Sequence, residues 1–132
     1  MHPQLEADTA TVCRLQLCEL LRMNDRQYPW VILVPRRAGV REIHRLEPEY
    51  QQLLWQEISA VSAALETRTR ADKMNVAALG NMVPQLHVHI IARFTGDPAW
   101  PGPVWGKHPP RPFSDEDLVS ECSQLASAFA DL

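Results

Sequence analysis

The sequence lacks the features that mark several specialised classes of protein. No stretch approaches the ~20 uninterrupted apolar residues of a transmembrane helix, so we expect no membrane span. The first residues show neither the basic start nor the apolar run of a signal peptide. The formal net charge of −3 argues against binding nucleic acid through bulk positive charge. These absences favour a cytoplasmic protein that acts on neither membranes nor nucleic acids.

Cysteine is also scarce. The only three are Cys13, Cys18 and Cys122, an odd number without a CxxC pair. We interpret them as reduced, mostly buried thiols of a cytoplasmic protein. A metal-binding or catalytic cysteine is the less favoured interpretation.

What is present indicates a single globular domain. The chain has 132 residues, of which 45% are hydrophobic and 22% charged, enough to build one core. The patterns of apolar and turn-forming residues predict helices and strands. We expect helices at 5–15, at 48 to about 66–69 and from Ser114 onward, strands at 17–23, 30–34, 73–79 and 84–94, and a short extended piece at 41–44.

The order of these elements predicts the fold class. Most strand connections are compatible with hairpins, so we expect an α+β fold in which one long helix and a C-terminal helix pack on an antiparallel sheet. The loop 95–113 is rich in proline, glycine and tryptophan. Its tryptophans must bury their rings on the body of the protein, over a site or on a second subunit.

The segment 85–91, QLHVHII, is the most informative part of the chain. Because side chains alternate across a strand, Gln85, His87 and His89 should share one face, with aliphatic residues filling the core behind them. One neutral imidazole can attack phosphorus, while a protonated neighbour stabilises the developing charge. The attacking ring needs a free lone pair, so its other nitrogen should donate a hydrogen bond, most simply to a backbone carbonyl.

Segment 85–91 resembles the histidine triad motif, in which three histidines alternate with aliphatic residues. The strand 30–34, the helix after Pro48, Asn75 and the Trp-Pro-Gly loop also follow the order typical of that superfamily. The resemblance covers about residues 15–106 and implies one histidine triad domain over 1–132, with a C-terminal loop and helix at 107–132. It also implies a homodimer in which the two sheets join into one.

The resemblance implies roles for the residues of the motif. His87 matches the nucleophile that attacks the α-phosphorus of a nucleotide and forms a covalent nucleotidyl-imidazole. His89 matches the third position, which contacts the phosphate and stabilises charge. Gln85 stands where the first histidine is expected. Glutamine keeps a donor and an acceptor but cannot be protonated, so the covalent step can survive while substrate choice, pH dependence and rate are open.

The resemblance also implies four substrate-binding positions outside the motif. Asn75 matches an asparagine near the phosphate or the leaving group, and Asn81 matches a polar residue beside the phosphate. Met82 follows it where a serine or threonine is usual, which removes one phosphate donor. Asn24 or Asp25 lies near the residue that holds the ribose hydroxyls, and the sequence leaves the choice between them open.

The implied activity is that of a nucleotide hydrolase or nucleotidyl transferase acting on nucleoside 5′-phosphate derivatives. Dinucleoside polyphosphates such as diadenosine tetraphosphate are favoured, and adenosine phosphoramidates and acyl-adenylates also qualify. The motif requires no cofactor and no bound metal, although a divalent cation such as Mg²⁺ could neutralise a polyphosphate substrate.

Two other interpretations remain open at this point. One is a non-catalytic nucleotide-binding dimer, a sensor or partner protein. It stays open because Gln85 replaces the first histidine of the motif. The other is a metal site built on His87 and His89, because a His-x-His pair is a common ligand set. Such a site needs a carboxylate nearby, and the first acid after the pair is Asp97.

Overall fold

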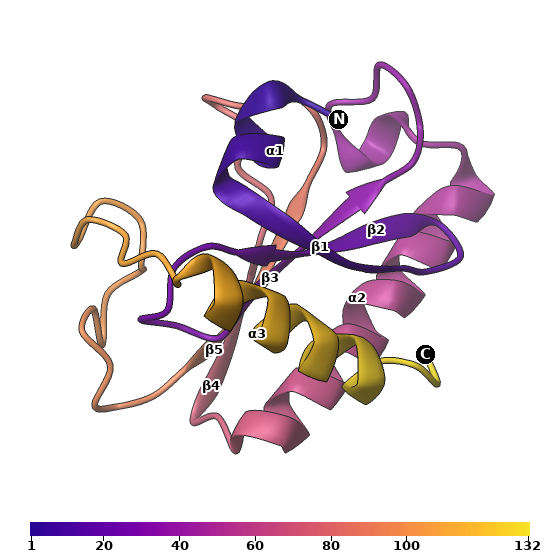
Figure 1. Cartoon of the computed structure of the whole chain (residues 1–132). Helices are drawn as coiled ribbons and strands as arrows, with labels where there is room; N and C mark the ends of the chain where they lie inside the picture. The colour runs from indigo at the N-terminus through magenta and orange to yellow at the C-terminus, as the bar shows by residue number, and fades with distance from the viewer.

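The computed structural model describes residues 1–132 and contains one five-stranded antiparallel sheet. The strand order across the sheet is β1-β2-β3-β5-β4. The elements along the chain are α1 (Pro3–Asp8), β1 (Thr9–Arg14), β2 (Cys18–Met23), β3 (Trp30–Pro35), η1 (Ile43–Arg45), α2 (Pro48–Thr69), β4 (Lys73–Ala77), β5 (Val88–Arg93) and α3 (Asp115–Ala128) (Figure 1). The expected α+β class is confirmed. No helix is long and apolar enough to cross a membrane.

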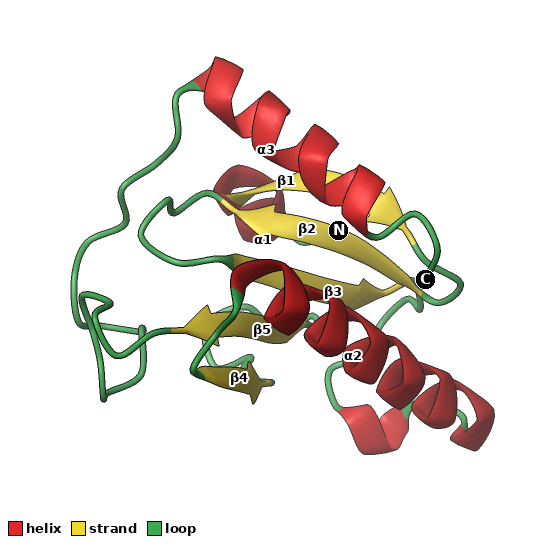
Figure 2. Cartoon of the chain, turned by 90° about the horizontal axis from the view of Figure 1, so that it is seen from below, coloured by secondary structure: helices red, strands yellow, loops and turns green.

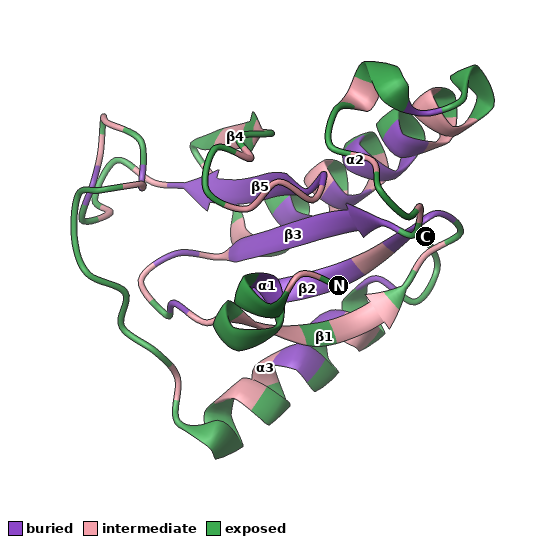
Figure 3. Ribbon diagram, turned by 90° about the horizontal axis from the view of Figure 1, so that it is seen from above, coloured by how far each residue is buried: buried purple, intermediate pink, exposed green.

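The two long helices cover one face of the sheet, and α1 lies on the other (Figures 2 and 3). Strand β3 shows why both faces can be covered, because all six of its residues are buried. Val31 and Leu33 point into the cluster shared with α2 and α3. Trp30 and Ile32 point into a second cluster with Leu5 of α1. The period of two along the strand therefore gives the molecule two cores.

The helix boundaries follow ordinary capping chemistry. Helix α2 begins with Pro48 at its first position and ends where Arg70 adopts a left-handed conformation with φ of 57°. Helix α3 begins after Ser114, whose hydroxyl accepts a hydrogen bond from the Asp117 amide at 3.1 Å. Both starts agree with the sequence prediction.

The prediction of a helix over 5–15 was wrong beyond its first turn. Helix α1 ends at Asp8, and the next six residues form β1, which pairs with β2 from Thr9 opposite Met23. Threonine and valine in this stretch favour a strand, and the edge of β2 offers hydrogen bonds that a short isolated helix cannot match. The sheet thus begins before residue 15, the start of the expected core.

Three further details differ from the prediction. Residues 41–44 form no strand, because the chain turns there into η1. Strand β5 begins at Val88 rather than near Pro84, and β4 ends at Ala77 rather than Leu79. His87 therefore lies immediately before the strand, where the chain has left the regular ladder, and His89 lies within it.

Candidate functional site

One ring nitrogen of His87 is engaged by a backbone carbonyl. Its Nδ1 lies 2.7 Å from the backbone oxygen of Gln85, and a carbonyl oxygen can only accept a hydrogen bond. Nδ1 therefore carries a proton, and Nε2 is the ring nitrogen left to face a substrate. The side chain is 6% exposed. This is the arrangement that the sequence argument required of an attacking histidine.

His89 is held in the opposite tautomer. The indole N–H of Trp30 donates to Nδ1 of His89 at 3.0 Å, and an indole nitrogen can only donate. Nδ1 of His89 is therefore unprotonated, and the ring's proton lies on Nε2, where it can donate to a ligand. The two imidazoles lie side by side with ring centroids 4.9 Å apart. The pair thus presents Nε2 of His87 and the Nε2–H of His89.

Burial disfavours the charged form of His89, whose tautomer is set by Trp30. Burial and the nearby His87 lower the pKa of His89 from 6.5 to about 3. A proton on Nδ1 would also face the indole N–H of Trp30. The expectation of a protonated neighbour is therefore wrong for His89 near neutral pH, because the ring is neutral and offers an N–H instead.

Aromatic rings enclose the histidine pair. Trp105 packs edge-on against His89 with centroids 5.1 Å apart and against Trp30 at 5.8 Å. Trp105 comes from the proline-rich loop, so that loop covers the site of its own chain. Trp100 lies elsewhere, with its ring 5.9 Å from the Arg93 guanidinium.

A buried ion pair shapes this loop. Arg93 binds both carboxylate oxygens of Asp97 at 2.7 and 3.0 Å, and it also donates to the Gly102 backbone oxygen at 2.8 Å. Asp97 in turn accepts from backbone amides, among them that of Trp100. A bidentate arginine–carboxylate pair fixes both distance and plane, so it holds the loop that carries Trp105.

Asn75 binds the Arg93 side chain that holds this loop, and it does not line the cavity beside the histidines. Its side-chain oxygen accepts a hydrogen bond from Arg93 at 2.9 Å. The residue lies on β4 opposite Ile91 of β5. Asn75 is therefore on the expected strand, but the structure commits its oxygen to the loop scaffold.

A cavity of about 670 Å³ opens beside the two histidines. Its walls come from α1 and the start of β1, from β2 and β3, from the turn after β4 and from the loop after β5. The lining residues are Gln4, Leu5, Asp8, Thr9, Met23, Ile32, Leu79, Gly80, Asn81, Met82, Val83, His87, His89 and Trp105. The volume suits a small organic ligand such as a nucleoside phosphate.

The turn after β4 brings Asn81 to this cavity. Gly80 has a φ of +80°, a conformation that favours glycine, and it turns the chain so that Asn81 and Met82 line the wall. Met82 is 93% exposed. An apolar side chain therefore stands at the cavity rim where a hydroxyl was the usual expectation.

The structure does not bring Asn24 and Asp25 to the cavity. The side-chain oxygen of Asn24 accepts from the Phe113 amide at 2.9 Å. The carboxylate of buried Asp25 accepts from the amides of Gln27 and Arg111. Both side chains instead secure the segment that leads into α3.

Gln85 has a structural partner of its own. Its side-chain oxygen accepts a hydrogen bond from the His2 backbone amide at 2.6 Å. His2 also caps α1, because its Nδ1 accepts from the Gln4 amide at 3.0 Å. The residue in the first triad position therefore fastens the start of α1, the helix that walls the cavity.

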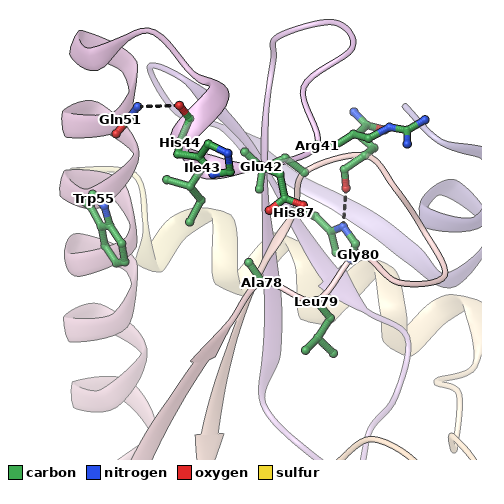
Figure 4. A pocket seen from close by; sticks show the side chains of 12 residues that line it. Arg41, Glu42, Ile43, His44, Gln51, Trp55, Ala78, Leu79, Gly80 and His87 are labelled. Carbon is green, nitrogen blue, oxygen red and sulfur yellow. Dashed lines mark hydrogen bonds between the residues drawn. The ribbon is translucent and has the colours of Figure 1, made fainter.

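A second cavity, of about 390 Å³, reaches His87 from another side. Its lining comes from residues 41–44, from α2 and from the segments that flank β4 and β5 (Figure 4). The side chains include Arg41, Glu42, His44, Gln51, Trp55, Ala78, Leu79, Gln85 and His87. Arg41 makes no hydrogen bond or ion pair through its guanidinium, which leaves it available to a ligand.

The structure gives no support to a metal site on the histidine pair. No group of three or more histidine, cysteine, aspartate or glutamate side chains is placed to hold a metal ion. Asp97, the nearest acid after the pair in sequence, is engaged by Arg93. The three cysteines are unpaired, with Cys18 and Cys122 buried and Cys13 half-buried.

Sequence reasoning missed Trp30 and α1 as parts of the site. Trp30 was interpreted only as a residue of a buried strand, and its polar atom lies 59 positions from its partner along the chain. The segment that forms α1 was assigned to a longer helix with no function. An indole N–H on a buried strand is a signal in itself, since such a donor needs a partner.

Comparisons with known proteins agree with this geometry. The family model of the HIT domain matches residues 4–96. A crystallised histidine triad protein from Marinobacter aquaeolei is 53% identical, with a TM-score of 0.96 and coverage of 100% of this chain and 96% of that one. A histidine triad protein from Bradyrhizobium japonicum is 48% identical, with a TM-score of 0.90 and coverage of 98% and 94%. A third, from Sinorhizobium meliloti, is 44% identical, with a TM-score of 0.91 and coverage of 99% and 94%. No curated protein matches the chain.

Proposed function

The chain belongs to the HIT domain family, and from this premise we propose that it is a nucleotide hydrolase or nucleotidyl transferase acting at the α-phosphorus of nucleoside 5′-phosphate derivatives. The observation that carries the proposal is the opposed tautomers of His87 and His89 at one cavity. The first ring offers a lone pair and the second offers an N–H. These are the two groups that attack on a phosphate requires.

In the first step, Nε2 of His87 attacks the α-phosphorus, an N–P bond forms, and the P–O or P–N bond to the leaving group breaks. The leaving group departs with the bonding electron pair and takes a proton from solvent. The His87 ring becomes cationic, and its Nδ1–H remains against the Gln85 carbonyl, which stabilises that charge. Nε2–H of His89 donates to a phosphoryl oxygen.

In the second step, water attacks the same phosphorus and the N–P bond breaks. The products are a nucleoside monophosphate and neutral His87, and the proton of the water passes to solvent. Trp105 and Trp30 exclude bulk water around His89, which strengthens its hydrogen bond to the phosphate. A histidine nucleophile thereby replaces one difficult displacement on an anion with two easier ones.

The two cavities are suited to different parts of the substrate. The larger one is lined largely by apolar side chains such as Leu5, Ile32 and Trp105, which suits a base and its sugar. The smaller one reaches the other side of His87 and holds the free Arg41, which suits an anionic leaving group. This favours dinucleoside polyphosphates over adenosine phosphoramidates. Mg²⁺ would then act on the polyphosphate of the substrate, and no resident cofactor is part of the proposal.

One alternative has an observation in its favour. A nucleotide-binding dimer with little turnover, a sensor or partner protein, is compatible with the structural use of Gln85 and with Met82 at the cavity rim. The resemblance leads one to expect a histidine at the first of these positions and a hydroxyl side chain at the second. Turnover separates the two functions, since a sensor binds nucleotide and releases no product.

We also propose a cytoplasmic homodimer. Strand β4 is an edge strand, and an unpaired edge can add a strand from a second copy. Large exposed apolar side chains lie on β4, beyond its end and on α2, namely Val76, Leu79 and Trp55. Their burial between two copies would explain their exposure here. The free cysteine thiols suit a reducing compartment.

The proposed activity is tested by a phosphorus NMR time course with diadenosine tetraphosphate and with adenosine phosphoramidate. We expect the native protein to release AMP and His87→Ala to release none while still binding AMP. The faster substrate identifies the subclass. AMP binding without release from either substrate would support the sensor instead, and equal release by His87→Ala would refute the mechanism.

A further inference from the structure

Three arginines line a small cavity on the face of the sheet that α2 and α3 cover. This cavity, of about 220 Å³, lies between the last turns of α2, the middle of α3 and the β2–β3 turn. Its charged side chains are Arg22, Arg26, Arg68 and Glu121, three positive groups against one negative group. The chain as a whole has a formal net charge of −3, so the sign of the charge at this wall is opposite to that of the whole molecule.

Arg22 forms the fixed floor of the cavity. It is buried, and its guanidinium donates to the backbone oxygens of Tyr28 at 2.9 Å and Trp30 at 3.2 Å. It also donates to the Glu121 carboxylate at 3.3 Å, and the ring of Phe113 lies 5.0 Å from it. Since these and other acceptors of the β2–β3 turn use its N–H groups, Arg22 adds charge and shape but offers a ligand no free donor.

Arg26 and Arg68 are the groups left free to bind. The guanidinium of Arg26 makes no ion pair and no hydrogen bond, while its backbone amide donates to the Arg111 oxygen at 2.8 Å. Arg68 has one partner, the neutral side chain of Gln124, at 3.4 Å. Neither arginine forms an ion pair with Glu121. Two like charges at one cavity repel each other, and an anion bound between them is attracted to both.

The walls of the cavity determine the class of ligand. A guanidinium presents its N–H donors in a planar fork that matches two oxygens of a carboxylate or a phosphate. The volume is about one third of that of the histidine cavity, which is too small for a base, sugar and phosphate together. The apolar side chains of Leu65, Phe113 and Leu125 line the cavity and present no competing acceptor.

We propose that this cavity is a second ligand site, which binds a small, multiply charged oxyanion between Arg26 and Arg68. The site lies against the first core cluster, whereas the histidine cavity lies against the second. Trp30 lies between the two sites, because its backbone oxygen accepts from Arg22 and its indole donates to His89. Inorganic phosphate and a small dicarboxylate share the required chemistry. The proposal does not depend on the function proposed for the histidines.

The test is calorimetric titration of the full-length protein with inorganic phosphate and, separately, with malonate, each with and without AMP. We expect binding with the same affinity in both conditions, because AMP belongs in the other cavity. Arg26→Gln and Arg68→Gln should each weaken this binding about fivefold, and added NaCl should weaken it further. The probe that binds more tightly identifies whether the ligand is a phosphate or a carboxylate.

A matched control keeps the result specific to the cavity. Arg45→Gln removes an exposed arginine that does not line it, and this variant should bind both probes as the native protein does. Unchanged thermal unfolding of Arg26→Gln and Arg68→Gln shows that they are folded. The site is overturned if neither probe binds, if both variants bind like Arg45→Gln, or if AMP displaces the anion. Failure of AMP itself to bind would count against the proposed function alone.

Discussion

Acid should destabilise this protein through His89, and the size of the effect follows from its surroundings. The folded ring is buried, accepts a hydrogen bond from Trp30 and stays neutral, since burial and His87 lower its pKa to about 3. In the unfolded chain the same ring has its ordinary pKa of about 6.5. Between these two values the unfolded state binds the proton and the folded state does not, so stability falls as the pH falls.

The magnitude at pH 5 is about 2 kcal/mol. At that pH the unfolded ring is about 1.5 pH units below its ordinary pKa, and each unit corresponds to about 1.36 kcal/mol. The loss should begin near pH 6.5 and reach about 3 kcal/mol by pH 4. Above pH 7 this loss of stability vanishes, because the His89 ring is neutral in both the folded and the unfolded state.

The assay is urea unfolding of the native protein and of His89→Gln at several pH values from 7.5 to 4.5. Glutamine keeps an acceptor for Trp30 but cannot be protonated, and all other titrating groups are shared by the two proteins. The difference in free energy of unfolding between the two should therefore shrink by about 2 kcal/mol between pH 7.5 and pH 5. A difference that stays constant across this range would refute the neutral state of His89.

Three further predictions concern the surroundings of the histidine pair. Trp30→Phe should lower turnover about tenfold and the free energy of unfolding by about 1–3 kcal/mol, because it leaves the buried Nδ1 of His89 without a donor. Trp100→Phe is the matched control. Equal kinetic losses in both variants would contradict the role of Trp30. Gln85→Ala should raise KM for a nucleotide substrate with little change in kcat, because it frees the start of α1. In steady-state assays, a loss confined to kcat would instead assign Gln85 to the chemical step. EDTA should leave turnover of adenosine phosphoramidate unchanged, since His87 rather than a metal ion makes the attack, and inhibition that Mg²⁺ reverses would count against this.

The sequence predicted those parts of the fold whose signals are local. The buried run of β3 and the proline start of α2 were found because a strand core and a helix cap are visible within a few residues. The hydrogen bond from a ring nitrogen of His87 to a backbone carbonyl was also predicted, because its partner is the carbonyl two residues earlier. These features need no knowledge of the rest of the chain.

The parts that could not be predicted depend on distant segments. Helix α1 gives way to β1 only because β2 offers a partner edge. Asn24 and Asp25 carry side chains that could bind ribose hydroxyls. They instead accept hydrogen bonds from backbone amides in residues 111–113, more than 80 positions away. The tautomer of His89 likewise depends on Trp30, which lies on the neighbouring strand β3. Pairings of this kind decide which polar side chain remains free for a ligand.

The most direct test of the account is the covalent intermediate on His87. The protein is mixed with adenosine phosphoramidate, quenched within a single turnover, digested and examined by mass spectrometry, since the account requires an N–P bond at this ring before water attacks. We predict one adenylyl group on the peptide that contains His87 and none in His87→Ala. Release of AMP by the native protein with no adduct at any quench time, or an adduct on another residue, would contradict the assignment of His87 as the nucleophile.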